Sequence, residues 1–164
     1  LNSNLRIITD KLPLNFQYVG FILSVFPEAK IIHLKRNAIA TCWSNYKHFF
    51  TYKENSYSHD LNDLAAFYNS YVDIMDFWHK LYPNKIYDLS YETLTTNQEH
   101  ETRKLIAYCN LEWDEKCLSF YENNRAVKTP SSFQVRNKMY QGSSDAWKQY
   151  EEFLKPLVKS LKSE

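Results

Sequence analysis

Two of the five arginines in this 164-residue chain stand where they could bind an anion. Arg36 directly follows a β-rich run and precedes a helical pattern, so its guanidinium and the helix N-terminus both favour negative charge. Ser44 follows eight residues later, about two helical turns into the same helix, and offers a hydroxyl. Arg136 lies in a long irregular segment that could close over the same place. These residues predict a phosphate clamp. The alternatives are a surface ion pair for Arg36 and solvent-exposed positions for the other two.

The elements that must position these residues alternate between strands and helices. Strands are expected at residues 5–9, 29–34 and 86–89, and helices at residues 16–26, 38–49, 60–81, 98–108, 115–120 and 145–161. The order β-α-β-α-α-β-α predicts an α/β fold with a small parallel sheet and right-handed helical crossovers. Ligands of such folds lie beyond the carboxyl ends of the strands, which is where Arg36 stands.

The composition excludes several classes of protein. The chain has only two glycines, where average usage of about 7% predicts about eleven, so it contains neither a Walker loop nor a Rossmann phosphate turn. Its 20 basic and 19 acidic residues nearly balance, so we expect no broad nucleic-acid or anionic membrane surface. No apolar run is long enough to span a bilayer.

The cysteines and histidines predict neither a disulfide framework nor a metal centre. The three cysteines form no CxxC pair and leave an odd number, which favours reduced thiols and a cytoplasmic location. The histidines show none of the short spacings typical of metal sites. His33 lies inside an expected strand, and we interpret it as a core histidine rather than a catalytic base.

A set of short motifs also occurs in a fixed order along nearly the whole chain. They are residues 7–15 (IITDKLPLN), 26–37 (FPEAKIIHLKRN), 41–46 (TCWSNY), 91–94 (YETL), 111–114 (LEWD), 131–136 (SSFQVR) and 147–150 (WKQY). Together they resemble the C-terminal two thirds of a sulfotransferase that uses 3′-phosphoadenosine 5′-phosphosulfate (PAPS). The resemblance is strongest to the bacterial group joined to tetratricopeptide repeats, related to the tyrosylprotein sulfotransferases. It implies a P-loop-like three-layer fold, with residues 1–164 forming a single partial domain.

The resemblance also implies a cofactor site. In the family, an arginine at the end of a strand and a serine eight residues later bind the 3′-phosphate, and Arg36 and Ser44 match these positions. Tyr91 matches a tyrosine that approaches the adenine; the alternative is a buried tyrosine at a strand end. Arg136, with Gln134 before it, matches a late loop that returns to the 3′-phosphate. The intact enzyme is then expected to transfer a sulfuryl group from PAPS to a hydroxyl or amine, without a metal, and to release 3′-phosphoadenosine 5′-phosphate (PAP).

Lys11 stands where the cytosolic sulfotransferases carry a catalytic histidine before Leu-Pro. A lysine near its reference pKa of about 10.4 is protonated at neutral pH and cannot act as a base. It could instead stabilise charge on the leaving phosphate or the sulfuryl oxygens, or hold the acceptor. The alternative is an ion pair with Asp10 or another carboxylate.

The chain departs from the family pattern at its start. The family's loop for the 5′-phosphosulfate precedes the strand that matches residues 7–8, so we expect a truncated domain that keeps the 3′-phosphate half of the site and has little activity alone. Its open sheet edge would be covered by a second copy or be poorly protected. Two alternatives stay open: a non-catalytic α/β module that binds a phosphorylated ligand or a partner protein, and, more weakly, a relative of the nucleotide kinases.

Overall fold

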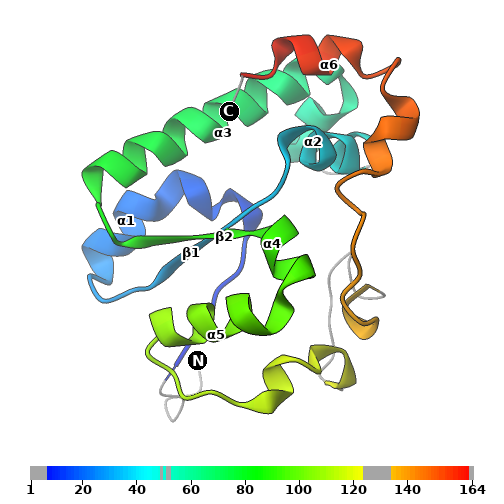
Figure 1. Ribbon diagram of the computed structural model, residues 1–164. Helices are drawn as coiled ribbons and strands as arrows, with labels where there is room; N and C mark the ends of the chain where they lie inside the picture. Colours follow the sequence, from blue (N-terminus) through cyan, green and yellow to red (C-terminus); the bar gives the residue numbers. More distant parts are fainter. Residues whose placement is uncertain (1–6, 49, 51–52, 124–133, 163–164) are drawn as a thin grey trace.

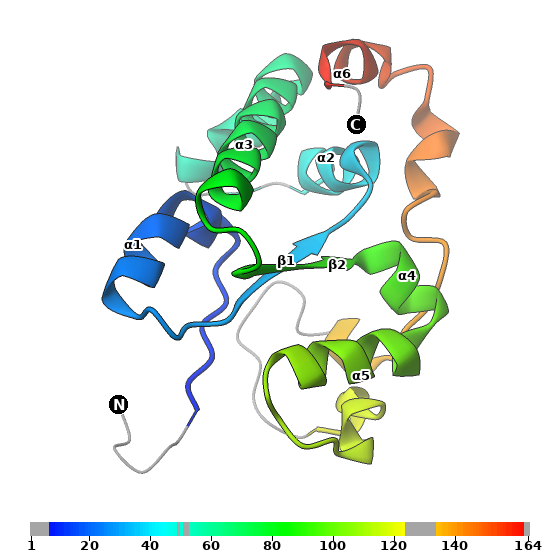
Figure 2. The ribbon, with the colours of Figure 1, turned by 60° about the vertical axis from the view of Figure 1, so that its left-hand side comes forward.

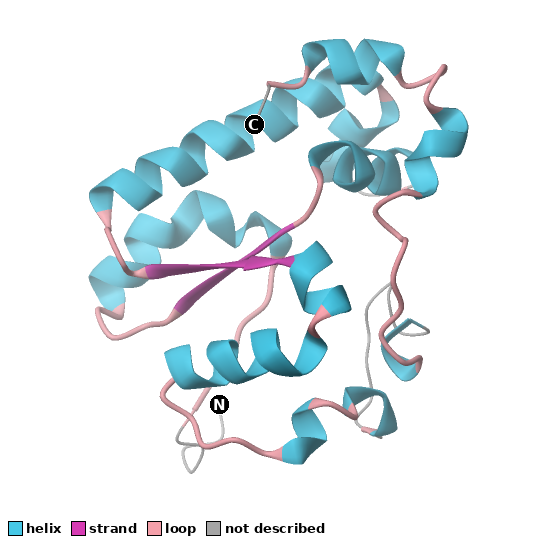
Figure 3. Ribbon diagram, viewed as in Figure 1, coloured by secondary structure: helices cyan, strands magenta, loops and turns pink. Residues whose placement is uncertain are grey.

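A computed structural model describes residues 7–48, 50, 53–123 and 134–162 of the chain. Its α-helices and strands are α1 (Val19–Val25), β1 (Ile31–Lys35), α2 (Ala38–Tyr46), α3 (Leu61–Leu81), β2 (Ile86–Ser90), α4 (Tyr91–Thr96), α5 (Gln98–Tyr108) and α6 (Lys155–Ser160) (Figure 1). Short 3-10 helices join them: η1 (Pro13–Tyr18), η2 (Lys53–His59), η3 (Glu115–Cys117), η4 (Phe120–Glu122), η5 (Gln134–Arg136) and η6 (Ala146–Tyr150). The described chain is mainly helical around a small sheet (Figure 3).

The sheet consists of β1 and β2, which pair in parallel with Ile31 opposite Ile86 and Lys35 opposite Ser90. The connection between them runs through α2 and α3, as expected for a helical crossover. Helices α1 and α3 lie on one side of the sheet, and α5 lies on the other (Figure 2). This mixed arrangement confirms the predicted α/β class, and it brings the carboxyl ends of both strands to the same end of the sheet.

Helix α3 supports the sheet through two apolar clusters. Asp60 caps its start by accepting hydrogen bonds from the backbone N–H groups of Asn62 and Asp63. Near that end, a buried cluster joins α3 to α2 and α6, with members Ala38, Cys42, Leu64, Ala65, Tyr68, Leu154 and Leu157. Near the other end, a second cluster joins α3 to α1 and β2, with members Val19, Leu23, Met75 and Ile86. The 3.6-residue apolar pattern predicts a helix here. In the structure, apolar side chains of α3 are buried near both of its ends.

The expected strand at residues 5–9 is wrong for the residues that the structure describes. Residues 7–9 have no strand geometry, and residues 5–6 lie outside the described part. Ile7 and Ile8 are 57% and 66% exposed. A strand forms only where a neighbour supplies hydrogen-bond partners, and the sheet among the described residues contains β1 and β2 alone.

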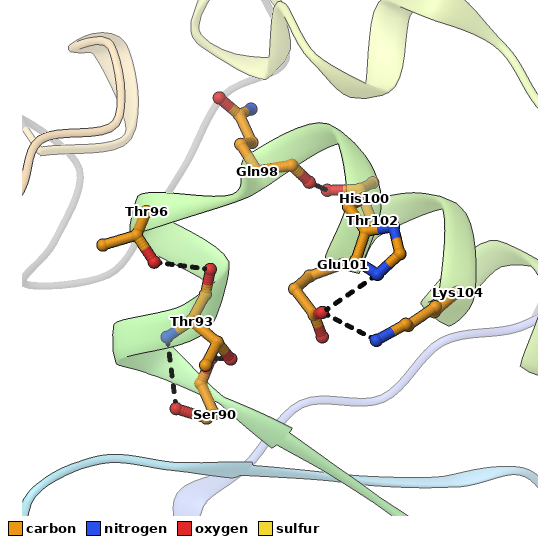
Figure 4. A network of polar contacts seen from close by, with 8 residues as sticks. All are labelled: Ser90, Thr93, Thr96, Gln98, His100, Glu101, Thr102 and Lys104. Carbon is orange, nitrogen blue, oxygen red and sulfur yellow. Dashed lines mark hydrogen bonds and ion pairs between the residues drawn. The ribbon is translucent and has the colours of Figure 1, made fainter.

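Two further elements differ from the sequence expectation. Helix α4 follows β2 without a loop, because the Ser90 hydroxyl accepts a hydrogen bond from the Thr93 N–H and caps the new helix (Figure 4). The expected helix at residues 145–161 is divided into η6 and α6. Pro156 stands in the first turn of α6 and lacks the N–H that a continuous helix would need.

The sequence also predicts three reduced cysteine thiols. All three cysteines are free, as predicted, and burial raises the pKa of the Cys42 thiol to about 12.

Ile32 and Leu34 of β1 are 44% and 53% exposed, so apolar side chains of the sheet stay uncovered in the single chain. The second copy expected over the sheet edge stays a prediction. Among the described helices, none combines the length and the apolar character needed to cross a bilayer.

Gly20 allows α1 to approach α3 closely. A Cβ atom at this position would lie 2.7 Å from two carbons of the Trp78 ring, which is held by a 2.7 Å hydrogen bond from its Nε1 to the carbonyl of Phe16. We expect Gly20→Ala to lower the free energy of unfolding, because an overpacking cost of about 1–3 kcal/mol exceeds the helix-propensity gain of about 1 kcal/mol. Urea denaturation measures the difference.

The matched control is Ser24→Ala on the exposed face of the same helix, which should leave stability nearly unchanged. If Gly20→Ala were as stable as the wild type, the close packing of α1 against Trp78 would be wrong.

Candidate functional site

Arg36 and Tyr91 directly follow the paired ends of β1 and β2. The guanidinium carbon of Arg36 lies 4.9 Å from the centre of the Tyr91 ring. Both side chains are partly buried, so the ring restricts the guanidinium and attracts its charge. The parallel register therefore brings together two residues that are separated in the sequence by α2, η2 and α3.

The late segment of the chain closes over this pair. Arg36 Nη2 donates a 2.6 Å hydrogen bond to the carbonyl of Ser143, and Nε donates a 3.1 Å hydrogen bond to the Ser144 hydroxyl. The hydroxyls of Tyr91 and Ser143 are also hydrogen-bonded, at 2.8 Å. Gly142 begins the turn with a φ of 88°, a conformation that favours glycine, and Asp145 N–H bonds back to its carbonyl at 3.1 Å. Backbone and side-chain contacts together thus hold the Arg36 guanidinium in place.

Glu92 joins the same cluster from the first turn of α4. Its Oε1 accepts a 2.6 Å hydrogen bond from the Ser144 hydroxyl and a 3.0 Å hydrogen bond from the Asn37 backbone N–H. Asn37 in turn caps α2 by accepting a hydrogen bond from the Ala40 N–H. Burial alone raises the pKa of Glu92, but the hydrogen bonds from Ser144 and Asn37, with others, outweigh it and hold the pKa below its ordinary value.

We define the strand-end cluster as Arg36, Asn37, Tyr91, Glu92, Ser143 and Ser144. In this cluster the Ser144 hydroxyl lies between Arg36 Nε and the Glu92 carboxylate. Arg36 Nη1 donates to no residue that the structure describes, so its N–H groups remain available to an incoming anion. Arg36 also stands at the N-terminal end of α2, where the helix dipole favours negative charge.

The other residues expected in the site are not among the members of the strand-end cluster. Ser44 is partly buried on α2, and its hydroxyl makes no hydrogen bond with a residue that the structure describes. Arg136 is exposed on η5, which packs against η4, and the side chain of Gln134 lies outside the described part. Lys11 is exposed in the irregular segment before η1 and pairs with no carboxylate that the structure describes. Its neighbour Asp10 instead accepts a 2.6 Å hydrogen bond from Asn15.

Sequence reasoning identified Arg36 and Tyr91 but missed four members of the cluster. Asn37 and Glu92 belong to the motifs that include Arg36 and Tyr91. An asparagine that can cap a helix and a carboxylate that can accept hydrogen bonds were the signals available for them. Ser143 and Ser144 follow one of the only two glycines of the chain, at the end of a long irregular segment. That position predicts a tight turn, although nothing local predicts its contact with Arg36.

The fold and the cluster thus describe an α/β protein with a partly buried, hydrogen-bonded arginine at the ends of two parallel strands. The family model described as "Sulfotransferase family" matches residues 1–115, and the chain belongs to this family. The matched range contains Arg36, Ser44 and Tyr91 and ends before Ser143 and Ser144.

A curated relative from Aquifex aeolicus (strain VF5), named "Uncharacterized protein", is 42% identical over 163 residues. This match covers 98% of the present chain and 21% of the relative, so the chain spans about a fifth of the relative's length. The similarity extends through the late segment that contacts Arg36.

The lowered pKa of Glu92 predicts a pH-dependent stability. The folded-state pKa lies below the ordinary value of 4.5, so the contribution of Glu92 is fully present above about pH 4.5 and is lost as pH falls through the folded pKa. Glu92→Gln removes this contribution. We therefore expect the stability difference between wild type and Glu92→Gln, measured by urea denaturation, to shrink as the pH is lowered from 6 to 3.

Glu28→Gln, at an exposed carboxylate before β1, serves as the control for loss of one charge. A difference between wild type and Glu92→Gln that did not vary with pH would contradict the hydrogen-bonded carboxylate.

Proposed function

We propose that the strand-end cluster binds the 3′-phosphate of PAPS and that the protein transfers a sulfuryl group to an acceptor hydroxyl or amine. The observation that carries the proposal is the fixed, partly buried guanidinium of Arg36 at the parallel strand ends of a sulfotransferase-family chain. We place the chain, as part of this proposal, in a P-loop-like fold and in the bacterial group related to the tyrosylprotein sulfotransferases.

The residues present fit a phosphate group. Arg36 is held by two hydrogen bonds and an aromatic ring, so little side-chain entropy is lost when it binds an anion. The nearby Glu92 carboxylate would oppose an anion, but donors from Ser144 and Asn37 already compensate part of its charge. The Ser143 hydroxyl, which is paired with the Tyr91 hydroxyl, is a further potential donor beside the guanidinium, whereas the single proton of the Ser144 hydroxyl is already donated to Glu92.

Each residue of the site then has a defined part. When bound, PAPS supplies the sulfuryl group that passes to the acceptor. Arg36 holds the 3′-phosphate and Tyr91 contacts the adenine. The resemblance to the family implies that Ser44, Gln134 and Arg136 also bind the 3′-phosphate. Lys11, as a cation, stabilises developing negative charge or holds the acceptor. Positioning and charge stabilisation supply most of the catalysis, as in phosphoryl transfer.

The assignment of Arg36 is tested by calorimetric titration with PAP and with adenosine 5′-monophosphate, which lacks the 3′-phosphate. Hydrogen bonds to charged groups contribute about 1.5–3 kcal/mol, and 1.4 kcal/mol corresponds to a tenfold change in affinity. We therefore expect Arg36→Ala to weaken PAP binding by at least about tenfold and to leave binding of the monophosphate nearly unchanged.

Arg103→Ala is a matched control, because Arg103 also lies over an aromatic ring, 4.0 Å from the centre of Trp113, but belongs to the exposed face of α5. It should bind PAP as the wild type does. Equal losses for both nucleotides in Arg36→Ala, or no loss for either, would remove Arg36 from the 3′-phosphate.

Lys11 is tested by the rate of PAP release from PAPS in the presence of an acceptor, measured on a chain extended upstream to include the expected 5′-phosphosulfate loop, because the chain alone is expected to have little activity. Lys11→Met keeps the length of the side chain but removes its charge. Loss of one charge-stabilising donor typically costs about 10²–10³ in rate, so we expect a decrease of this order with unchanged PAP affinity. Lys30→Met, at an exposed lysine near the Tyr108 ring, is the control.

A decrease caused equally by Lys30→Met, or weaker PAP binding in Lys11→Met, would contradict the proposed part of Lys11. The alternative function, a non-catalytic module that binds a phosphorylated ligand, predicts PAP binding without PAP release even by the extended wild-type chain.

A further inference from the structure

Three potential metal ligands converge on the sheet face that α3 covers, away from the strand-end cluster. His33 lies in β1 directly opposite Asp88 of β2, so the two side chains lie on the same face of the sheet. His79 reaches them from the last turn of α3. The three ligands come from two strands and a long helix, which are rigid elements that suit a preorganised site.

The distances among the three ligand atoms suit a small tetrahedral ion. Asp88 Oδ1 lies 2.6 Å from His33 Nδ1 and 3.3 Å from His79 Nε2, and all three atoms lie within 4.8 Å of one another. Ligands about 2.0–2.1 Å from a tetrahedral zinc ion are about 3.3 Å apart. The His79–Asp88 pair already has this separation. The His33–Asp88 pair is shorter and the His33–His79 pair lies within 4.8 Å, so binding needs only small rotations of these side chains.

The surroundings of the cluster match those of a metal site. The side chain of His33 is 13% exposed, and its other ring nitrogen, Nε2, is hydrogen-bonded to the Tyr71 hydroxyl. Such a partner orients a ligating imidazole and places the ring proton away from the metal. The side chains of His79 and Asp88 are 35% and 53% exposed, so an ion and a water molecule have access from solvent.

We propose that His33, His79 and Asp88 bind one Zn²⁺ ion, with a water molecule as the fourth ligand. Two imidazoles and one carboxylate form a ligand set that favours zinc over the hard cations Mg²⁺ and Ca²⁺, which take oxygen ligands. The ion joins the end of α3 to the middle of both strands, three residues before Arg36 and Tyr91. The proposal is independent of the proposed sulfuryl transfer.

The test uses the chain freed of metal with a chelator and titrated with Zn²⁺ in competition with a chromophoric indicator. We expect one ion per chain, a higher melting temperature with Zn²⁺, and a Co²⁺ derivative whose visible spectrum is that of four-coordinate cobalt. His79→Gln and Asp88→Asn should each weaken Zn²⁺ binding by at least about tenfold. Both residues are partly exposed, and circular dichroism confirms that the variants fold.

His100→Gln, at a histidine that is 70% exposed on α5, is the matched control and should bind Zn²⁺ like the wild type. The proposal is overturned if Zn²⁺ does not saturate at one ion per chain. It is equally overturned if folded His79→Gln and Asp88→Asn retain wild-type affinity, because the three side chains would then form a hydrogen-bonded cluster only.

Discussion

The parallel register of β1 and β2 is the constraint on which both proposed sites depend. Lys35 pairs with Ser90, so the next residues, Arg36 and Tyr91, meet beyond the strand ends. The same register sets His33 opposite Asp88 in the middle of the sheet. A shift by one residue would move the side chains of one strand to the other face and would separate both pairs.

Helix α3 maintains this register, because it connects the two strands and packs at both of its ends. One end shares a buried cluster with α2 and α6, and the other shares a cluster with α1 and β2. The first cluster also fixes the late part of the chain, since Leu154 and Leu157 are almost completely buried in it. Packing of that segment allows the preceding turn at Gly142 to hold Ser143 and Ser144 against Arg36.

Local patterns predicted the elements whose causes are local. The apolar periodicity and the Asp60 cap predict α3, and the β-rich run before Arg36 predicts β1. The strand expected at residues 5–9 was wrong for residues 7–9, because pairing depends on a neighbouring strand that composition does not reveal. Arg36 and Tyr91 were found through motifs, whereas the Ser143 and Ser144 contacts span more than 100 residues and leave no local trace. The cluster of His33, His79 and Asp88 was missed for the same reason, since His33 is 55 residues from Asp88 in the sequence.

The central claim is that an arginine fixed at the parallel strand ends recognises the 3′-phosphate of the nucleotide. A crystal structure of the chain with PAP bound tests it most directly. The account predicts the 3′-phosphate within hydrogen-bond distance of the Arg36 guanidinium, with the adenine beside Tyr91. A nucleotide bound with its 5′-phosphate at Arg36, or bound away from the strand-end cluster, would contradict it.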